Sequence, residues 1–365
     1  MAIKPTPFGT QITLVGQSDS GKTNMLAALL GNTNAHADLQ TGPGRITDVS
    51  WSAATDDSSD DKQVEQLMGY ADNILRGRVL TNEGSNEVRI YPCTLDYRKI
   101  VKVTKRQGLF NGSVVYDEPS DPKRINFKII DGRGGDIAPE NYLDPDNPQD
   151  ERPIARQREY RDRLNESVGA IVIMPIDKKG FQRDLANRLV RELMRTIDER
   201  KKASDLPKLK HVALCYTKYD ALFTHLGAGA GEKAASWDAV VKHLADSAMV
   251  KVFQPLFSLA QNDPEFKICI FPVSTFGFVH GTGAANFYNL EESPGLLTRT
   301  IKRDDWNNPE TPDLINHFPF EMTENQAQSL WRPFNIAPPI YFALTGKITG
   351  PLYLHPEEIL SEEDV

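Results

Sequence analysis

An eight-residue pattern near the start of the chain most restricts how the chain can fold. Gly16-Gln17-Ser18-Asp19-Ser20-Gly21-Lys22-Thr23 fits the pattern G-x-x-x-x-G-K-[ST]. It follows the apolar run QITLVG, typical of a buried strand, and precedes NMLAALLGN, typical of a helix. The backbone N–H groups of such a loop turn inward around phosphate oxygens, where the positive end of the helix also favours negative charge. The pattern therefore predicts a strand–loop–helix unit that binds phosphate.

Two side chains of this loop have distinct expected roles. Lys22 is expected to place its charge between the terminal phosphates, and Thr23 is expected to offer its hydroxyl to magnesium. The whole stretch from Gly16 to Asn24 is expected to contact the ligand. The alternative is a glycine turn that only caps a helix.

The rest of the chain alternates strand-like and helix-like segments. Apolar runs that read as buried parallel strands are QITLVG (11–16), AIVIMPI (170–176), HVALCYT (211–217) and KICIFPVS (267–274), with INFKIID (125–131) as a fifth, alternating strand. Phe181, Leu185, Leu189, Leu193 and Ile197 recur at four-residue spacing and indicate an amphipathic helix. This order predicts an α/β fold: a doubly wound, mostly parallel six-stranded sheet with helices on both faces.

Three further motifs follow predicted strands. They are Asp131-Gly132-Arg133-Gly134, Thr217-Lys218-Tyr219-Asp220 and Pro272-Val273-Ser274-Thr275-Phe276-Gly277. Together with the first pattern, in this order, they resemble the D-x-x-G, [NT]-K-x-D and S-A-K-like elements of the Ras-like (TRAFAC) P-loop GTPase superfamily. The resemblance covers most of the chain.

That resemblance implies that the chain binds GTP or GDP together with Mg²⁺. Asp131 would hold the metal through water, and the Gly134 N–H would contact the terminal phosphate. Asp220 would accept hydrogen bonds from guanine, which adenine cannot donate from that edge. Lys218 would lie along the base and Thr217 would brace neighbouring loops.

Ser274, Thr275 and Phe276 would touch the guanine from its other side. Phe276 replaces the usual lysine of this element. A phenylalanine there is equally consistent with stacking on the base and with simple core packing.

The sequence departs from the superfamily in its switch and catalytic positions. Thr81 is the expected magnesium-binding switch threonine, with Thr41, Thr47, Thr55 and Thr94 as alternatives. Gly135 stands where a water-positioning glutamine is usual, so we expect slow hydrolysis that depends on Arg133, Asp136 or an arginine from a partner. The expected catalytic set is Lys22, Arg133, Gly134 and Asp136.

The expected organisation is one GTPase domain over 8–350 and an acidic tail over 351–365. Two insertions interrupt the domain, a polar and partly mobile one at about 32–90 in the first switch region and another at 278–332. The apolar segment APPIYFALTGKI suggests a final helix.

Composition limits the partners. A net charge of −8 argues against broad nucleic-acid binding, and no apolar run approaches membrane-spanning length. The start, MAIKPTPFGT, lacks a secretory signal pattern, so we expect a cytoplasmic protein whose three cysteines are reduced thiols. The large insertion, DGRGG and WRPFNIAPPIYFAL also resemble the bacterial double-GTPase group, which implies a bacterial protein that controls a protein partner in a multi-subunit system.

Two alternative functions remain open at this level. Gly135 also fits a GTP-binding scaffold that does not hydrolyse its nucleotide. The segment from Val114 to Glu118 resembles the strand-ending Asp-Glu pair of P-loop ATPases, in which aspartate holds magnesium and glutamate activates water.

Overall fold

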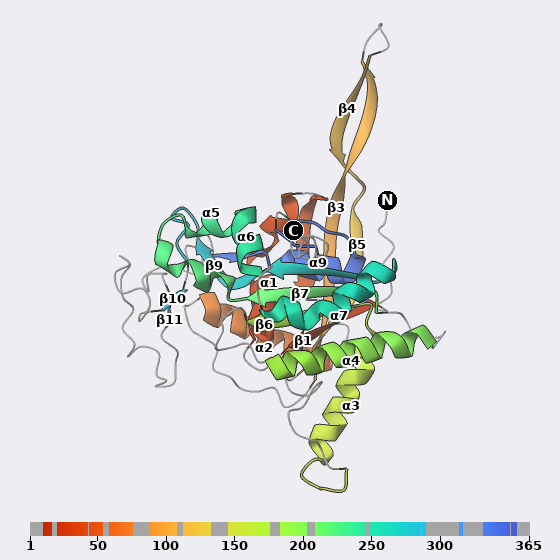
Figure 1. The fold of residues 1–365 in the computed structure, drawn as a ribbon. Helices are drawn as coiled ribbons and strands as arrows, with labels where there is room; N and C mark the ends of the chain where they lie inside the picture. Colours follow the sequence, from red (N-terminus) through yellow and green to blue (C-terminus); the bar gives the residue numbers. More distant parts are fainter. Residues whose placement is uncertain are drawn as a thin grey trace, which may run out of the picture.

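The computed structural model in Figure 1 describes residues 10–16, 20–42, 44–53, 58–75, 88–107, 112–132, 145–175, 183–202, 209–244, 248–285, 287–289, 314–316, 331–350 and 352–355. The strands are β1 (Thr10–Gly16), β2 (Ile46–Ala53), β3 (Arg89–Gln107), β4 (Gly112–Pro119), β5 (Lys123–Asp131), β6 (Gly169–Pro175), β7 (His211–Thr217), β8 (Lys267–Pro272), β9 (Ser274–Val279), β10 (Phe287–Asn289), β11 (Leu314–Asn316) and β12 (Trp331–Phe334). The α-helices are α1 (Lys22–Gly31), α2 (Ser58–Leu75), α3 (Glu151–Glu166), α4 (Arg183–Lys202), α5 (Ala230–Ala234), α6 (Trp237–Leu244), α7 (Ala248–Asn262) and α9 (Ala337–Thr345). Two 3₁₀ segments are η1 (Thr33–Gln40) and η2 (Tyr219–Leu226).

The main sheet has the strand order β2-β3-β5-β1-β6-β7-β8, with β4 paired to β3. The run from β5 to β8 is parallel, whereas β2, β3 and β4 pair antiparallel. The five strands predicted from apolar runs are confirmed, and so is the mostly parallel α/β sheet. The predicted count of six strands is wrong, because the described part of the sheet has eight.

Side-chain alternation along the parallel strands divides the core in two. Val172 and Leu214 face one cluster, which α3, α4 and α7 cover, and their neighbours Ile173 and Cys215 face the other, which α1, α2 and α9 cover. The doubly wound arrangement follows, because a strand buried on both faces must be apolar at every position.

The segment predicted as a polar, partly mobile insertion contains regular structure. η1, β2 and the 18-residue helix α2 all lie within 32–90. Leu67 and Ala71 of α2 are buried, and Ala71 packs against Gly31 of α1, where a Cβ would come within 2.3 Å of the Ala71 Cβ. The acidic run that suggested a solvated loop overlaps the start of α2 in the sequence.

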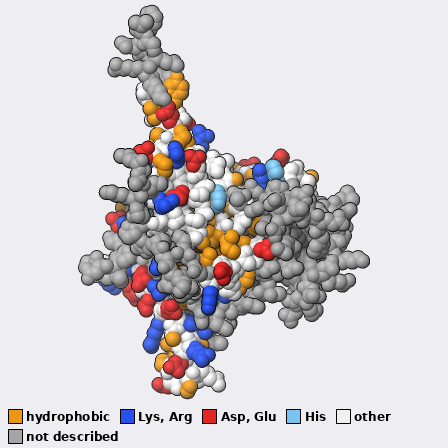
Figure 2. All heavy atoms as spheres, turned by 180° about the vertical axis from the view of Figure 1, so that it is seen from behind, with side chains coloured by type: hydrophobic (Ala, Val, Ile, Leu, Met, Phe, Trp, Pro, Cys, Tyr) orange, Lys and Arg blue, Asp and Glu red, His pale blue; other side chains and the backbone are white. Residues whose placement is uncertain are grey.

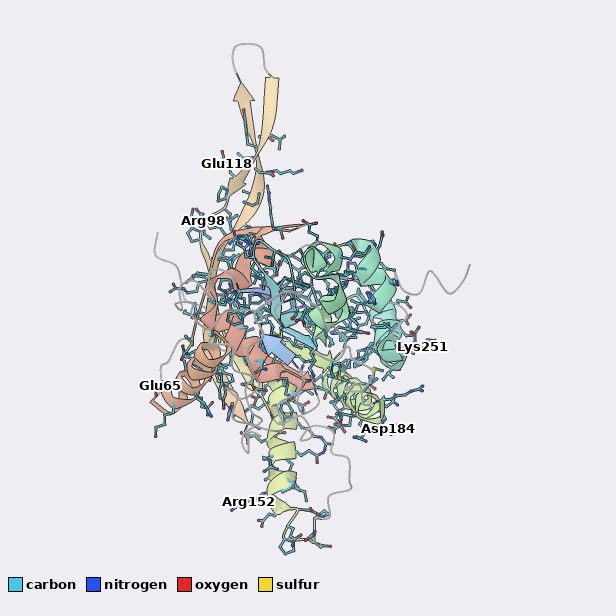
Figure 3. The ribbon with its side chains drawn as sticks, turned by 90° about the vertical axis from the view of Figure 1, so that its left-hand side faces the viewer. Glu65, Arg98, Glu118, Arg152, Asp184 and Lys251 are labelled. Carbon is cyan, nitrogen blue, oxygen red and sulfur yellow. The ribbon has the colours of Figure 1, made fainter. Side chains whose placement is uncertain are left out.

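β3 and β4 continue beyond the sheet as a two-stranded hairpin (Figures 1 and 2). Val101, Val115 and Tyr116 are exposed on it. Figure 3 shows Glu118 of the hairpin and Arg152 at the start of α3 at opposite ends of the molecule. Arg89, at the start of β3, pairs with Asp131 at the carboxyl end of β5. The hairpin is at the other end of β3, so it extends from the end of the sheet where the parallel strands begin.

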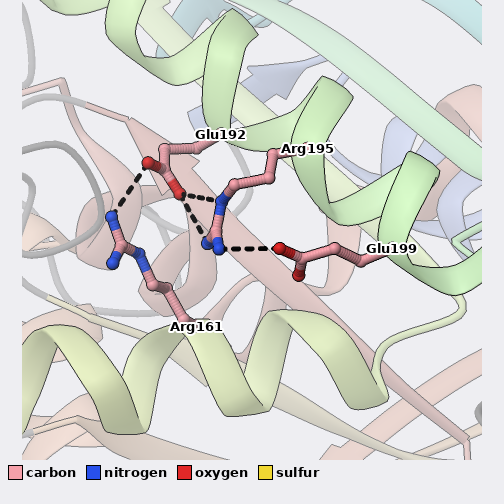
Figure 4. A network of polar contacts seen from close by, with 4 residues as sticks. All are labelled: Arg161, Glu192, Arg195 and Glu199. Atoms are coloured by element: carbon pink, nitrogen blue, oxygen red, sulfur yellow. Dashed lines mark hydrogen bonds and ion pairs between the residues drawn. The ribbon is translucent and has the colours of Figure 1, made fainter.

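A polar network joins α3 to α4 (Figure 4). Glu192 accepts hydrogen bonds from Arg161 of α3 at 2.9 Å and from Arg195 at 2.9 Å, and Arg195 also donates to Glu199 at 2.9 Å. These groups are partly exposed, so the network fixes the relative position of the helices more than it adds stability.

The predicted final helix is confirmed as α9, which is buried along almost its whole length against β6 and β7. None of the helices in the described ranges is long and apolar enough to cross a membrane.

Candidate functional site

The predicted site residues with described positions gather where the parallel strands end. Gly16, Asp131, Thr217 and Pro272 are the last residues of β1, β5, β7 and β8. In open α/β sheets, ligands bind beyond these carboxyl ends. All four motif-bearing loops therefore start at this one end of the sheet.

The described ends of the glycine loop, Gly16 and Gly21, have backbone features that suit a phosphate cradle. Gly21 has φ +91°, a conformation that favours glycine, and a Cβ on Gly16 would lie 2.3 Å from the carbonyl oxygen of Ile173. Lys22 is the first residue of α1, only 7% exposed, and its Nζ donates to the Gly16 carbonyl at 3.1 Å. The ammonium group therefore lies over the loop.

Ser20 gives a second reason to expect phosphate at this loop. Its hydroxyl is buried, and within the described part of the chain it has no hydrogen-bond partner. A buried hydroxyl without a partner is costly, and a phosphate oxygen would supply one. The residues present thus fit a phosphate group, while Gln17, Ser18 and Asp19 lie outside the described residues.

Thr23 and Asp131 form the pair expected to serve magnesium. The Thr23 hydroxyl donates to Asp131 Oδ2 at 3.1 Å, and Asp131 is 4% exposed. Burial raises the pKa of Asp131, and the charge of Lys22 and the hydrogen bond from Thr23 oppose that rise. An oxygen-only pair of this kind suits a hard divalent ion. Thr81, the third expected metal ligand, lies outside the described residues.

Arg89 is a neighbour of this pair that sequence reasoning missed. It stands directly opposite Asp131 in the β3–β5 register, so both side chains lie on the face that α1 covers. Its guanidinium hydrogen-bonds Tyr91 of β3 and Tyr70 of α2, and its charge lowers the pKa of Asp131. Only the register between two strands about forty residues apart identifies Arg89, and no local sequence signal does.

Three alternative switch threonines have other partners or positions. Thr94 donates to Asn126 inside the sheet at 3.0 Å, and Thr41 donates to the carbonyl of Asp38 in an exposed turn. Thr47 pairs with Arg98, towards the hairpin end of β3. Thr55 lies outside the described residues.

The predicted base-reading motif is physically joined to the glycine loop. Thr217 donates to the Ser20 carbonyl at 2.8 Å, which is the bracing role expected of it. Lys218 adopts φ +60°, which non-glycine residues rarely take, and it leads directly into η2. Asp220 then lies in the first turn of η2, 4% exposed.

Asp220 is held in place by Ser274. The Ser274 hydroxyl donates to Asp220 Oδ1 at 2.6 Å and accepts from the Gly277 N–H at 2.8 Å. Burial raises the pKa of Asp220 to about 6. Hydrogen bonds from Ser274 and from the backbone N–H groups of Asp220 and Ala221 oppose this rise, as does the charge of Lys218. This carboxylate is therefore desolvated but still able to accept further hydrogen bonds through its other lone pairs.

The third motif continues as a strand rather than as the expected short loop. β9 begins at Ser274 and pairs antiparallel with β12. The Thr275 carbonyl accepts from Trp331 Nε1 at 3.0 Å, and Phe276 packs, partly buried, against the core on the α1 face. A Cβ on Gly277, which has φ +56°, would meet the Arg332 carbonyl at 1.9 Å, so this close strand pairing requires glycine.

Arg133, Gly134, Gly135 and Asp136 lie outside the described residues. Lys22 is therefore the one member of the expected catalytic set whose position is described. Asn24, the last residue expected to contact the ligand in this stretch, lies in the first turn of α1.

The position of Asp117 and Glu118 argues against an ATPase site there. Asp117 forms a 3.2 Å ion pair with Arg45, and both side chains are about half exposed. Both acidic residues lie on the hairpin. The hairpin extends from one end of the sheet, and Lys22 lies at the other end. A pair so placed cannot act on phosphates held at the glycine loop.

No protein-family model matches the sequence, and no curated protein matches it either. Among solved structures, the chain is similar to a chain of the "Signal recognition particle receptor SRb-GTP/SRX complex from Chaetomium thermophilum". The sequence identity is 12% and the TM-score 0.32, over 75% of this chain and 94% of that chain. The assignment of each site residue therefore depends on the geometry of this chain.

Proposed function

We propose that this chain binds GTP and GDP with Mg²⁺ and acts as a slow nucleotide switch that controls a protein partner. The hydrogen bond from Thr217 to the Ser20 carbonyl carries this proposal, because it ties the loop that would hold phosphate to the loop that would read guanine. The two loops follow β1 and β7, which only β6 separates in the sheet, and both start at the carboxyl ends of the strands, where such sheets bind ligands.

Each described residue has a defined part in this proposal. Lys22 and the backbone around Gly21 hold the phosphates, and Thr23 and Asp131 hold magnesium, whose bound charge offsets that of the outer phosphates. Asp220, oriented by Ser274, accepts from the two donors on the edge of guanine. The charge of Arg89 opposes the rise that burial gives the pKa of Asp131 and so favours its ionised form.

Slow turnover follows from the absence of a side chain at Gly135, which cannot orient water. Arg133 and Asp136 are the proposed residues that assist hydrolysis, and Gly134 is the proposed sensor of the terminal phosphate. The same glycine favours the second candidate, a GTP-binding scaffold without meaningful hydrolysis. Single-turnover measurement of GDP formed from bound GTP separates the two functions.

The direct test is calorimetric titration of the purified protein with GDP, a non-hydrolysable GTP analogue and the matching ATP analogue. With magnesium present, we expect both guanine nucleotides to bind and the ATP analogue to bind at least about 100-fold more weakly, since adenine leaves Asp220 unpaired. Removing magnesium with a chelator is expected to weaken the GTP analogue most. Equal binding of both triphosphate analogues, or no binding of any nucleotide, would contradict the proposal.

The preference for guanine is expected to depend on pH through Asp220. Its pKa is raised to about 6 in the folded protein, and the protonated carboxyl cannot accept both guanine donors. The ratio of GDP to ADP affinity should therefore fall by about tenfold for each pH unit below 6. Taking the ratio cancels the titration of Asp131, which affects both nucleotides alike.

In the nucleotide-free protein, the stability contribution of Asp220 changes with pH in the opposite direction to the affinity ratio. Because its folded pKa of about 6 lies above the ordinary value of 3.8, its stabilising contribution is complete below pH 3.8 and is lost as pH rises through 6. Asp220→Asn is the control for both effects: the slope of its affinity ratio should disappear, and its stability should lose only the part of the pH dependence that Asp220 contributes, since Asp38, with a pKa raised to about 6, still titrates. A flat affinity ratio between pH 5 and 7 in the unaltered protein would remove Asp220 from guanine recognition.

A further inference from the structure

A second candidate ligand site lies at the opposite edge of the sheet from the proposed nucleotide site. A cavity of about 150 Å³ is present there, lined among others by Ile197, Arg200, Lys201, Leu209, Asp263 and Phe266. Leu209 and Phe266 come just before β7 and β8 in the chain, so the cavity is at the amino ends of the parallel strands. Lys22 and Asp131 lie at the carboxyl ends.

Arg200 contributes a buried cation to this cavity. Its side chain is 1% exposed, and Nη1 donates to the Ser167 carbonyl at 2.8 Å. Nε and Nη2 are buried and have no hydrogen-bond partner among the described residues. Burial lowers the pKa of Arg200 to about 10, which is the direction expected of a cation that lacks an anionic partner.

The two unpartnered nitrogens form one recognition edge. Nε–H and one Nη2–H of a guanidinium point in parallel and match the two oxygens of a carboxylate. This chain uses that edge elsewhere, where Arg124 donates from Nε at 2.7 Å and from Nη2 at 2.8 Å to the two oxygens of Asp96. Arg195, on the same helix as Arg200, is likewise satisfied by Glu192 and Glu199 (Figure 4).

The surrounding charges favour a singly charged ligand. Arg200, Lys201 and Lys210 line the cavity with Asp263 and Glu265, which leaves one net positive charge. Lys201 is itself paired with Asp263 at 3.1 Å. A carboxylate matches this balance, whereas a doubly charged phosphate would lie close to two carboxylates.

We propose that the Arg200 cavity is a carboxylate-binding site, in which Nε and Nη2 of Arg200 bind the two oxygens of one carboxylate. Two sources have this chemistry, a small free carboxylic acid and the acidic end of this chain. Leu354 forms an antiparallel bridge with Ile270, so the chain there runs toward the start of β8, where Phe266 lines the cavity. Glu357 and Glu358 follow His355 in the sequence.

The test follows the Arg200 Nε–H resonance of the full-length, ¹⁵N-arginine-labelled protein by NMR during titration with sodium acetate. Sodium chloride at equal ionic strength is the control titration. The Arg124 resonance is an internal control, because its edge is already occupied by Asp96. Arg200→Lys, which keeps the charge but not the edge, assigns the signal. The same titration is repeated on full-length protein carrying Glu357→Gln and Glu358→Gln.

A saturable acetate-specific shift of the Arg200 signal in the unaltered protein supports the site and assigns it to a free acid. A shift that appears only in the Glu357→Gln, Glu358→Gln protein supports the site and assigns it to the tail. If neither protein shows a saturable shift, no carboxylate binds at Arg200 and the proposal is overturned. If chloride produces the same shift, the response is not specific for a carboxylate, and the proposal is overturned as well. If Arg200→Lys does not fold, the titration of the unaltered protein still decides the outcome.

Discussion

Asp220→Asn is expected to lower the affinity for GDP by at least about 100-fold while leaving the affinity for ADP unchanged. The asparagine amide directs an NH₂ group where guanine also presents donors, and charge-assisted hydrogen bonds worth about 1.5–3 kcal/mol each are lost. Titration calorimetry at pH 7.5, where Asp220 is ionised, measures both affinities. The pKa of about 6 places that pH safely above its titration.

We also expect Asp220→Asn to bind one other nucleotide more tightly than the unaltered protein does. Xanthosine diphosphate carries a carbonyl where guanine has its exocyclic amine, so the amide NH₂ can donate to it, and we expect this nucleotide to bind the variant better than the unaltered protein. The fold should tolerate the change, because Ser274 can still donate to the amide oxygen and no charge remains buried. Asp238→Asn, an exposed position in the first turn of α6, is the matched control and should change no affinity. Equal losses for GDP and ADP in Asp220→Asn would show a general defect rather than lost base reading.

Lys22→Met is expected to weaken GDP and ADP alike, by about 1,000-fold or roughly 4 kcal/mol. The Lys22 ammonium is almost fully buried above the glycine loop, where low dielectric strengthens its attraction for phosphate. Methionine keeps the length and the apolar contacts of the lysine stem but removes the charge. The thermal unfolding midpoint should therefore change little, and this distinguishes lost binding from lost folding.

Lys251→Met is the matched control, since Lys251 is exposed on α7 (Figure 3). It removes one positive charge from the protein and should leave nucleotide binding intact. The ratio of GDP to ADP affinity should be preserved in Lys22→Met and lost in Asp220→Asn. Unchanged nucleotide binding in Lys22→Met would mean that the glycine loop does not hold phosphate.

The strands that carry the site were predictable because both of their faces are buried. A continuous apolar run such as HVALCYT has few alternatives, and β7 spans the residues predicted. β2 was not predicted, because it lies at an antiparallel edge where polar residues alternate with apolar ones. Part of β4 was considered only as a short strand ending in Asp117 and Glu118, because the apolar run there is short. The helix α2 was missed because its acidic first turn also resembles a solvated loop.

Candidate residues within one motif were found from sequence, and the resemblance implied that Thr217 braces neighbouring loops, but the partners of the contacts between motifs were not found. The hydrogen bond from Thr217 to Ser20 joins residues that are nearly two hundred positions apart in the sequence. The hydrogen bond from Ser274 to Asp220 joins two different loops. Arg89 faces Asp131 only through strand register, and Arg200 becomes notable only once its unpartnered edge is located beside a cavity. Composition and spacing contain no information about any of these.

By itself, the sequence determined the order of buried strands, the glycine loop and the residues proposed to contact phosphate, magnesium and guanine. These are local properties, set by side-chain periodicity and by backbone conformations that only certain residues adopt. The tertiary structure alone decided which residues from distant segments meet, how deeply Asp220 and Arg200 are buried, and which edge of the sheet each site occupies. Those properties arise because a parallel sheet brings the ends of strands far apart in sequence to one edge, and because burial changes the charge state that each group prefers.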